Sequence, residues 1–193
     1  MVSPTTDQIS DWEDELLRVR QESEWLAEQL TEAQFNWRPG PDRWSVGQCF
    51  DHLAIATGLM LEKVNPEIER AHREGIAGAP PFRYGMMGGW FVAMMEKPPG
   101  KRGMPAPGNF VPPSDVPRAQ VLRKYFAVLD DLSKALHTSH GLALGKLKVA
   151  SAAKGGSWLR FNLAAWFAAT LAHLRRHLAQ AKRVTETEGF PAR

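Results

Sequence analysis

Two histidines four positions apart, His173 and His177, lie in a segment of helical periodicity. On a helix this spacing puts both imidazoles on one face, one turn apart, where they can bind one metal ion together. The same face is otherwise almost wholly apolar, with Leu159, Leu163, Trp166, Thr170, Ala181 and Val184. Two imidazoles in such surroundings would lack hydrogen-bond partners, and a metal ion would satisfy their ring nitrogens. The spacing also occurs on solvated helices, a setting that the neighbouring Arg175 and Arg176 would equally suit.

A third histidine, His52, lies in another predicted helix, on a mainly apolar face. We expect that face to point into the protein, with Gln48, Cys49, Ile55, Ala56 and Leu59. In a helical bundle the three imidazoles can meet, and we predict a divalent metal site at His52, His173 and His177. Three protein ligands leave at least one coordination position open, as in catalytic sites. There the ion can lower the pKa of a bound water to about 7 or bind a thiol as its thiolate.

Other side chains near these histidines have two interpretations each. Cys49 could be a fourth ligand or a redox thiol, but we favour a small buried hydrophobic residue. Arg176 and Gln180 could orient an anionic substrate, although solvent exposure or a salt bridge at the helix end suits them at least as well. For His137 and His140, at the end of the preceding helix, we favour interaction with the helix dipole over metal binding. No catalytic residue is assigned.

A first helix is predicted from a capping box at Thr5 and Gln8 to about Leu30. Its inward stripe consists of Ile9, Trp12, Leu16, Val19, Leu26 and Leu30, with Ser23 in the one polar position. The proline and glycine residues of segment 31–43 cannot continue a helix and predict a turn.

A second capping box, Ser45 with Gln48, begins the helix that carries the third histidine. At Pro66 this helix either kinks or ends and restarts, and both alternatives stay open. The connection that follows, Gly75–Pro113, is rich in glycine and proline and is long for a compact domain. Its apolar segment Trp90–Met95 is either a lid or, as we prefer, part of a crossover that covers the core.

The third long helix is predicted to start at Ser114 or Asp115 and to close at Gly141. The fourth should run from about Trp158 to Val184. Four long helices without an alternating strand pattern favour an all-α fold, a four-helix bundle with a long crossover between the second and third helices.

The chain has 193 residues, of which 44% are hydrophobic and 23% charged, a composition that suits one globular domain over residues 1–193. The polar and acidic segment Met1–Trp12 lacks the features of a signal peptide, and the lone Cys49 fits a reducing compartment, so we expect a cytoplasmic protein. The longest apolar stretch, Ala164–Leu171, is too short to cross a bilayer. Acidic residues (21) nearly match basic ones (24) and are interspersed with them, which argues against nucleic-acid binding.

The segments around the histidines resemble a known family. Three stretches are similar to the opening shared by DinB/YfiT-like proteins: Trp37-Arg38-Pro39, Trp44-Ser45-Val46-Gly47-Gln48 and Asp51-His52-Leu53-Ala54. The segment from His173 to Gln180 is similar to the H-x-x-x-H stretch, followed by glutamine, in the family's last helix. With the number and spacing of the helices, the likeness spans nearly the whole chain. It is interrupted mainly by the Gly75–Pro113 insertion.

This resemblance implies a four-helix bundle of unusual helix order, a homodimer, and a divalent metal ion on the three matching histidines. Zinc or nickel would be the first expectation, with iron, manganese and copper as alternatives. Relatives include S-transferases and isomerases that use low-molecular-weight thiols such as bacillithiol or mycothiol, which implies a metal-bound thiolate attacking a small-molecule electrophile. The alternative is a non-catalytic bundle for stress response or small-molecule binding, in which the ion only ties two helices together.

Overall fold

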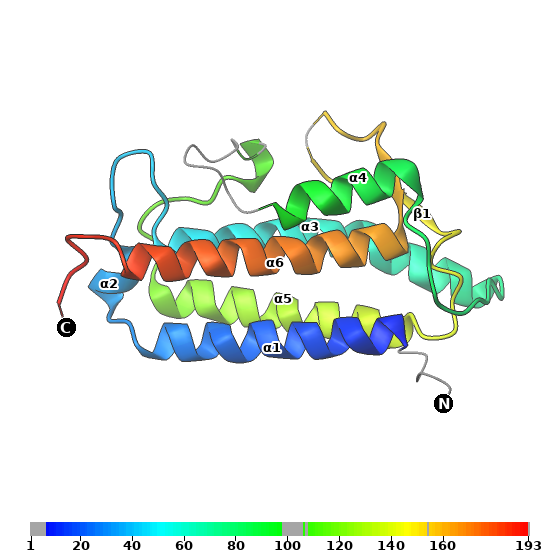
Figure 1. Cartoon of the computed structure of the whole chain (residues 1–193), viewed down its shortest axis with the longest axis horizontal. Coiled ribbons are helices and arrows are strands. Elements are labelled where there is room, and N and C mark those ends of the chain that lie inside the picture. Colours follow the sequence, from blue (N-terminus) through cyan, green and yellow to red (C-terminus); the bar gives the residue numbers. More distant parts are fainter. Residues whose placement is uncertain (1–6, 98–105, 107, 154, 193) are drawn as a thin grey trace.

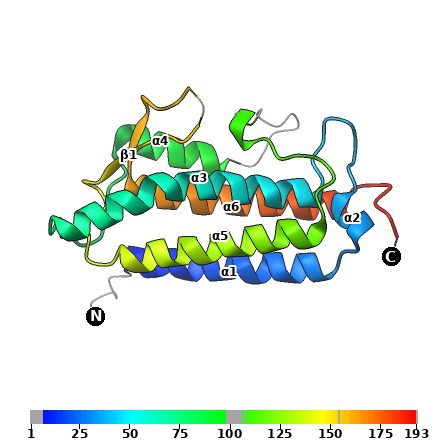
Figure 2. The ribbon, with the colours of Figure 1, turned by 180° about the vertical axis from the view of Figure 1, so that it is seen from behind.

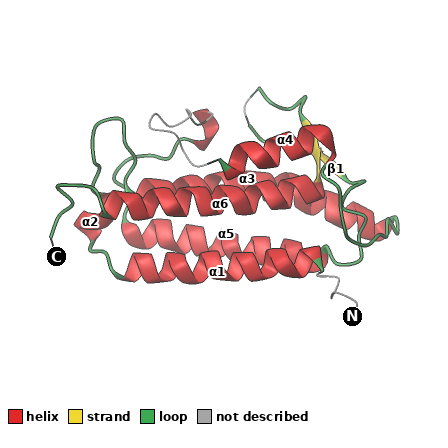
Figure 3. Ribbon diagram, viewed as in Figure 1, coloured by secondary structure: helices red, strands yellow, loops and turns green. Residues whose placement is uncertain are grey.

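Helices form most of the chain in the computed structural model, which describes residues 7–97, 106, 108–153 and 155–192. Four of them are long: α1 (Gln8–Glu28), α3 (Val46–Arg73), α5 (Arg118–Thr138) and α6 (Leu163–Thr185). The shorter elements are α2 (Glu32–Asn36), α4 (Gly85–Glu96), the 3-10 turn η1 (Gly108–Phe110), and the strands β1 (Lys148–Ala150) and β2 (Arg160–Asn162). This mostly helical architecture confirms the predicted bundle (Figure 3).

The four long helices form a closed bundle in which some neighbours along the chain are not neighbours in space. α1 packs against α5 and α6, and α3 packs against the same two helices. Figures 1 and 2 show α3 and α5 both running away from the end of the bundle where α2 lies, whereas α1 and α6 run toward it. The helix order therefore differs from a simple up-and-down bundle.

The long crossover follows from this arrangement. α3 and α5 are parallel neighbours, so the chain must return along the length of the bundle before α5 can begin (Figure 1). A helix of this length spans about 40 Å at about 1.5 Å per residue. On the way back α4 packs against α6, with Gly88 and Val92 buried. The segment Trp90–Met95 thus belongs to a helix that covers α6, in agreement with the predicted crossover rather than with a lid.

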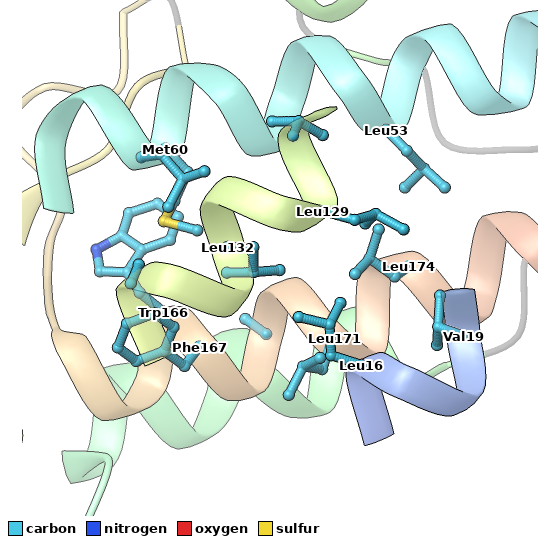
Figure 4. Close-up of a cluster of buried hydrophobic side chains, with 14 of the residues drawn as sticks. Leu16, Val19, Leu53, Met60, Leu129, Leu132, Trp166, Phe167, Leu171 and Leu174 are labelled. Carbon is cyan, nitrogen blue, oxygen red and sulfur yellow. The ribbon is translucent and has the colours of Figure 1, made fainter. Parts of the chain in front are cut away.

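A continuous apolar core joins the four long helices. Leu53 of α3, Leu129 of α5 and Leu174 of α6 point toward one another in its centre, and each is at least 99% buried (Figure 4). The predicted stripe of α1 is buried over its whole length, including Ser23. Burial of apolar surface on this scale is the main force that holds such helices together.

Helix starts are where local sequence and structure agree most closely. Ser45 and Gln48 form the predicted capping box, each side chain bonding to the other's backbone N–H. A further capping box, of Thr31 and Gln34, begins the short α2 inside the segment predicted as a turn. Thr5 lies outside the described residues, and α1 is capped instead by the side chain of Asp7.

One open alternative is decided, and two other boundaries correct the predictions. α3 continues through Pro66, so the alternative in which the helix ends and restarts there is wrong. α5 begins only at Arg118, with Pro117 at the cap position. A proline disfavours helical backbone at the residue before it, so the helix does not extend further toward Ser114. α6 begins at Leu163 rather than at the exposed Trp158, and the residues before it pair as the antiparallel hairpin β1–β2, with Val149 opposite Phe161.

No helix among the described residues is long and apolar enough to cross a membrane, in agreement with the sequence.

The buried polar contact between α1 and α5 makes a testable contribution to stability. Ser23 Oγ lies 2.9 Å from Tyr125 Oη and also donates to the carbonyl of Val19. Ser23→Ala leaves the buried tyrosine hydroxyl without this partner, and we expect a loss of about 1–3 kcal/mol in the free energy of unfolding. The double variant Ser23→Ala/Tyr125→Phe should lose less than Ser23→Ala alone, because no hydroxyl is then left unpaired.

Urea denaturation measures these losses, with the exposed Ser133→Ala as the matched control. If the double variant loses as much unfolding free energy as Ser23→Ala and Tyr125→Phe lose together, the two hydroxyls are not coupled.

Candidate metal centre

The structure brings the three predicted histidines of α3 and α6 to one point. The ring centroids of His52 and His177 are 4.6 Å apart, those of His173 and His177 also 4.6 Å, and those of His52 and His173 4.9 Å. Each ring offers a nitrogen, and these three nitrogens all lie within 4.8 Å of one another. Residues more than 120 positions apart in the sequence therefore form one cluster that could hold a metal ion.

His52 is positioned by the start of α3. The capping box of Ser45 and Gln48 sets the first turn, and His52 follows in the second. The indole of Trp44, directly before the cap, packs on two of the imidazoles, with centroid distances of 4.8 Å to His52 and 5.7 Å to His177. Trp44 thus forms one wall of the cluster.

The other two histidines depend on the anchoring of α6. Its cap residue Asn162 accepts from the backbone N–H of Ala165 and donates to the carbonyls of Arg83 and Gly145. Every residue from Leu163 to Ala172 is buried, so the helix enters the bundle rigidly held on all sides. One turn separates His173 from His177, and both rings reach the same side of α6 toward His52.

The crossover orients His52 through its backbone. His52 Nδ1 lies 2.7 Å from the carbonyl oxygen of Phe110 in η1 and donates to it. This bond leaves Nε2 of His52 with a free lone pair, directed at Nε2 of His173 at 3.0 Å. Metal-ligating histidines usually donate their other ring nitrogen in this way, which fixes the ring and its tautomer. No sequence signal identified Phe110, because the acceptor is a backbone atom that any residue supplies.

The surroundings keep all three imidazoles neutral. Burial, together with the neighbouring imidazoles and the positive charge of Arg176, lowers the pKa of His173 to about 3 and that of His177 to about 2. The pKa of His52 is also lowered by burial, against the opposing effects of the Phe110 carbonyl and the Asp51 carboxylate. Neutral imidazole is the form that binds metal, so the cluster is prepared for a cation without first losing protons.

The donor set fits a divalent ion. Among the described residues, the buried Nδ1 of His177 has no hydrogen-bond partner. A buried polar atom without a partner destabilises the folded protein unless a ligand binds there. Two nitrogens that are each about 2.0 Å from a tetrahedral zinc ion are roughly 3.3 Å apart, close to the 3.0 Å between His52 and His173. Three neutral imidazoles suit zinc, nickel, copper or iron.

Of the neighbouring candidates, Cys49 lies in the core and apart from this cluster. It is fully buried, and burial raises the pKa of its thiol to about 12, so it packs as a small hydrophobic residue. Arg176 is near the cluster: it donates to the carbonyl of Met94 in α4, and its Nε is buried without a partner among the described residues. Gln180, one turn further along α6, has a small raising effect on the pKa of His177, against the effect of burial.

One prediction about the surroundings needs correction. Ile55, Ala56 and Leu59 share a face of α3 with His52, but they are only half-buried. The core face of α3 is instead the one that carries Leu53 and packs between α5 and α6. The histidine cluster therefore lies at the edge of the core, where some solvent-accessible surface remains. Trp90 of the crossover is 63% exposed.

The sequence profile described as DinB superfamily matches residues 15–181. The chain belongs to the DinB superfamily. This match covers most of the chain, including all three histidines of the cluster and the crossover, and it agrees with the helical bundle of the structure. Comparison of this DinB protein with curated proteins and with solved structures finds no match.

The lowered pKa values predict how the stability of the metal-free protein depends on pH. In the unfolded chain His173 and His177 take up protons near pH 6.5, whereas in the folded protein they stay neutral until about pH 3 and pH 2. Unfolding below pH 6.5 therefore takes up protons, and the free energy of unfolding should fall as the pH is lowered. Each histidine contributes a slope of up to about 1.4 kcal/mol per pH unit.

Urea denaturation of chelator-treated protein between about pH 7 and pH 4 measures this slope. The variant His173→Gln/His177→Gln should show a shallower slope than the wild type. Identical slopes would mean that both histidines are protonated in the folded protein, contrary to their burial.

Proposed function

We propose that this DinB protein binds one divalent metal ion through His52, His173 and His177, with zinc or nickel as the first expectation and iron, manganese or copper as alternatives. The observation that supports this most strongly is the convergence of three neutral imidazoles, one of them oriented by the Phe110 carbonyl. A triad of this kind leaves at least one coordination position for water or a substrate atom.

We further propose that the protein is a metal-dependent enzyme acting on a small molecule, in the manner of a thiol-dependent S-transferase. A metal ion held by the triad would favour the thiolate form of a low-molecular-weight thiol, whose proton would pass to solvent water. The sulfur would then form a bond to an electrophilic carbon, whose leaving group departs with its bonding electrons.

The residues around the triad have roles that suit such a reaction. Trp44 excludes water from one side of the imidazoles. The guanidinium of Arg176, with its unpaired Nε, could attract an anionic group of the thiol or of its partner. A positive charge there also favours negative charge on a sulfur atom close by. No residue is assigned as a general base, because none of the described acids faces the triad.

A non-catalytic bundle, in which the ion ties α3 to α6, is the second candidate. Two surface cavities, of about 230 and 410 Å³, are lined by residues other than the histidines of the triad, so neither is a substrate pocket of this site. An enzyme normally binds its substrate in a cavity beside the reactive group.

The expected homodimer and the expected cytoplasmic location stay predictions.

Removal of one ligand tests the metal site. His173→Ala should lose one equivalent of bound metal from protein purified without chelator, because two imidazoles hold a divalent ion far more weakly than three. Elemental analysis of purified protein measures the loss. His72→Ala removes an exposed histidine at the end of α3 and should keep the wild-type metal content. Equal metal content in both variants would reject the triad as the site.

A thiol screen separates the two candidate functions. Metal-loaded protein is mixed with single low-molecular-weight thiols and an electrophilic chromogenic probe. Turnover that depends on one thiol and is lost in His173→Ala would support the transferase. If no thiol is consumed faster than in the control without protein, while the metal is bound, the non-catalytic bundle is the correct alternative. Arg176→Ala should raise KM for an anionic thiol more than for a neutral one.

A further inference from the structure

A second group of metal-binding side chains lies where α1 begins and α5 ends. His137 in the last turn of α5 and His140 just after it face Glu13 of α1 across the helix pair. His137 Nδ1 is 3.6 Å from one carboxylate oxygen of Glu13, and His140 Nε2 is 3.3 Å from the other. One ligand atom from each residue lies within 4.8 Å of the other two. Figure 1 shows the two helix ends side by side.

The hydrogen bonding of His140 needs a cation or a second ring proton. Its Nε2 faces Glu13, and its Nδ1 lies 3.3 Å from a carboxylate oxygen of Asp7. A neutral imidazole has one N–H and can donate to only one of these two carboxylates. A metal ion between Nε2 and Glu13 makes both contacts favourable, since Nδ1–H then donates to Asp7. Metal-ligating histidines commonly have this carboxylate partner on the second nitrogen.

Asp7 is held in place independently of the histidines. It is the cap of α1, where its side chain accepts from the backbone N–H of Ile9 and from the hydroxyl of Ser10. The C-terminal end of the α5 helix dipole carries partial negative charge, which favours a cation at this place. Gly141, with φ of 78°, turns the chain directly after His140.

We propose that Glu13, His137 and His140 form a second binding site for a divalent transition-metal ion, with Asp7 orienting His140. Two imidazoles and one carboxylate suit zinc, nickel, copper or iron better than calcium or magnesium. The site is at the surface, with His137 82% and His140 37% exposed by side chain, so the ion exchanges with solvent more easily than one in the triad. A bound ion would join the start of α1 to the end of α5.

Titration of chelator-treated protein with Zn²⁺ alone tests the proposal. Isothermal titration calorimetry should detect two equivalents in the wild type, and one in the variant His173→Ala/His177→Ala, which lacks two triad ligands. In that variant, His137→Ala or Glu13→Gln should abolish the remaining equivalent, whereas His72→Ala should retain it. Since the two sites are removed separately, failure of one does not affect the test of the other.

The role of Asp7 has its own variant. Asp7→Asn keeps the capping side chain, because asparagine caps helices as well as aspartate, but removes the charge beside His140. It should weaken the second equivalent by roughly 10- to 100-fold. Far-UV circular dichroism checks that each variant is folded, and the highly exposed His137→Ala avoids any loss of packing.

Two results would overturn the proposal: a folded His173→Ala/His177→Ala variant that binds no ion, or an equivalent in that variant that survives both His137→Ala and Glu13→Gln. In the first case Glu13, His137 and His140 do not bind an ion. In the second case the further ion binds elsewhere. If the triad variant does not fold, the fall from two equivalents to one in His137→Ala of the otherwise unchanged chain gives the same answer.

Discussion

Three imidazoles can share one point at the edge of this core only because they are neutral and each is held in a fixed orientation. Two of them come from one turn of α6, whose first ten residues are wholly buried, and the third comes from the second turn of α3. Charged imidazoles at these distances would repel one another in surroundings of low polarity. Burial removes that charge, and it also leaves ring nitrogens without water, which favours a ligand that accepts three lone pairs together.

The helix order of the bundle serves this arrangement. α3 and α6 are far apart in the sequence but pack directly against each other, so the cluster also joins the two halves of the chain. Since α3 and α5 are parallel neighbours, a long return segment is needed, and that segment brings the Phe110 carbonyl to His52. The crossover is therefore part of the site, although none of its described side chains belongs to the triad.

Much of this could be predicted from local sequence. Capping residues and apolar spacing identified the long helices, and the pair at positions 173 and 177 identified the site because helical periodicity alone places both on one face. What could not be predicted depends on contacts distant in sequence. The acceptor for His52 is a backbone atom, the core face of α3 was misassigned by one helical position, and the hairpin before α6 is too short to show a strand pattern. The carboxylates around His140 also come from another helix, so sequence alone favoured the simpler interaction with the helix dipole.

The central claim is that three imidazole nitrogens bind one ion at the triad. X-ray absorption spectroscopy at the zinc edge, on protein loaded with one equivalent of Zn²⁺, tests this most directly because it reports the type and distance of the ligand atoms. We expect three histidine nitrogens at about 2.0–2.1 Å and one further oxygen or nitrogen ligand. A sulfur atom at about 2.3 Å, or fewer than three imidazoles in the outer-shell scattering, would contradict it.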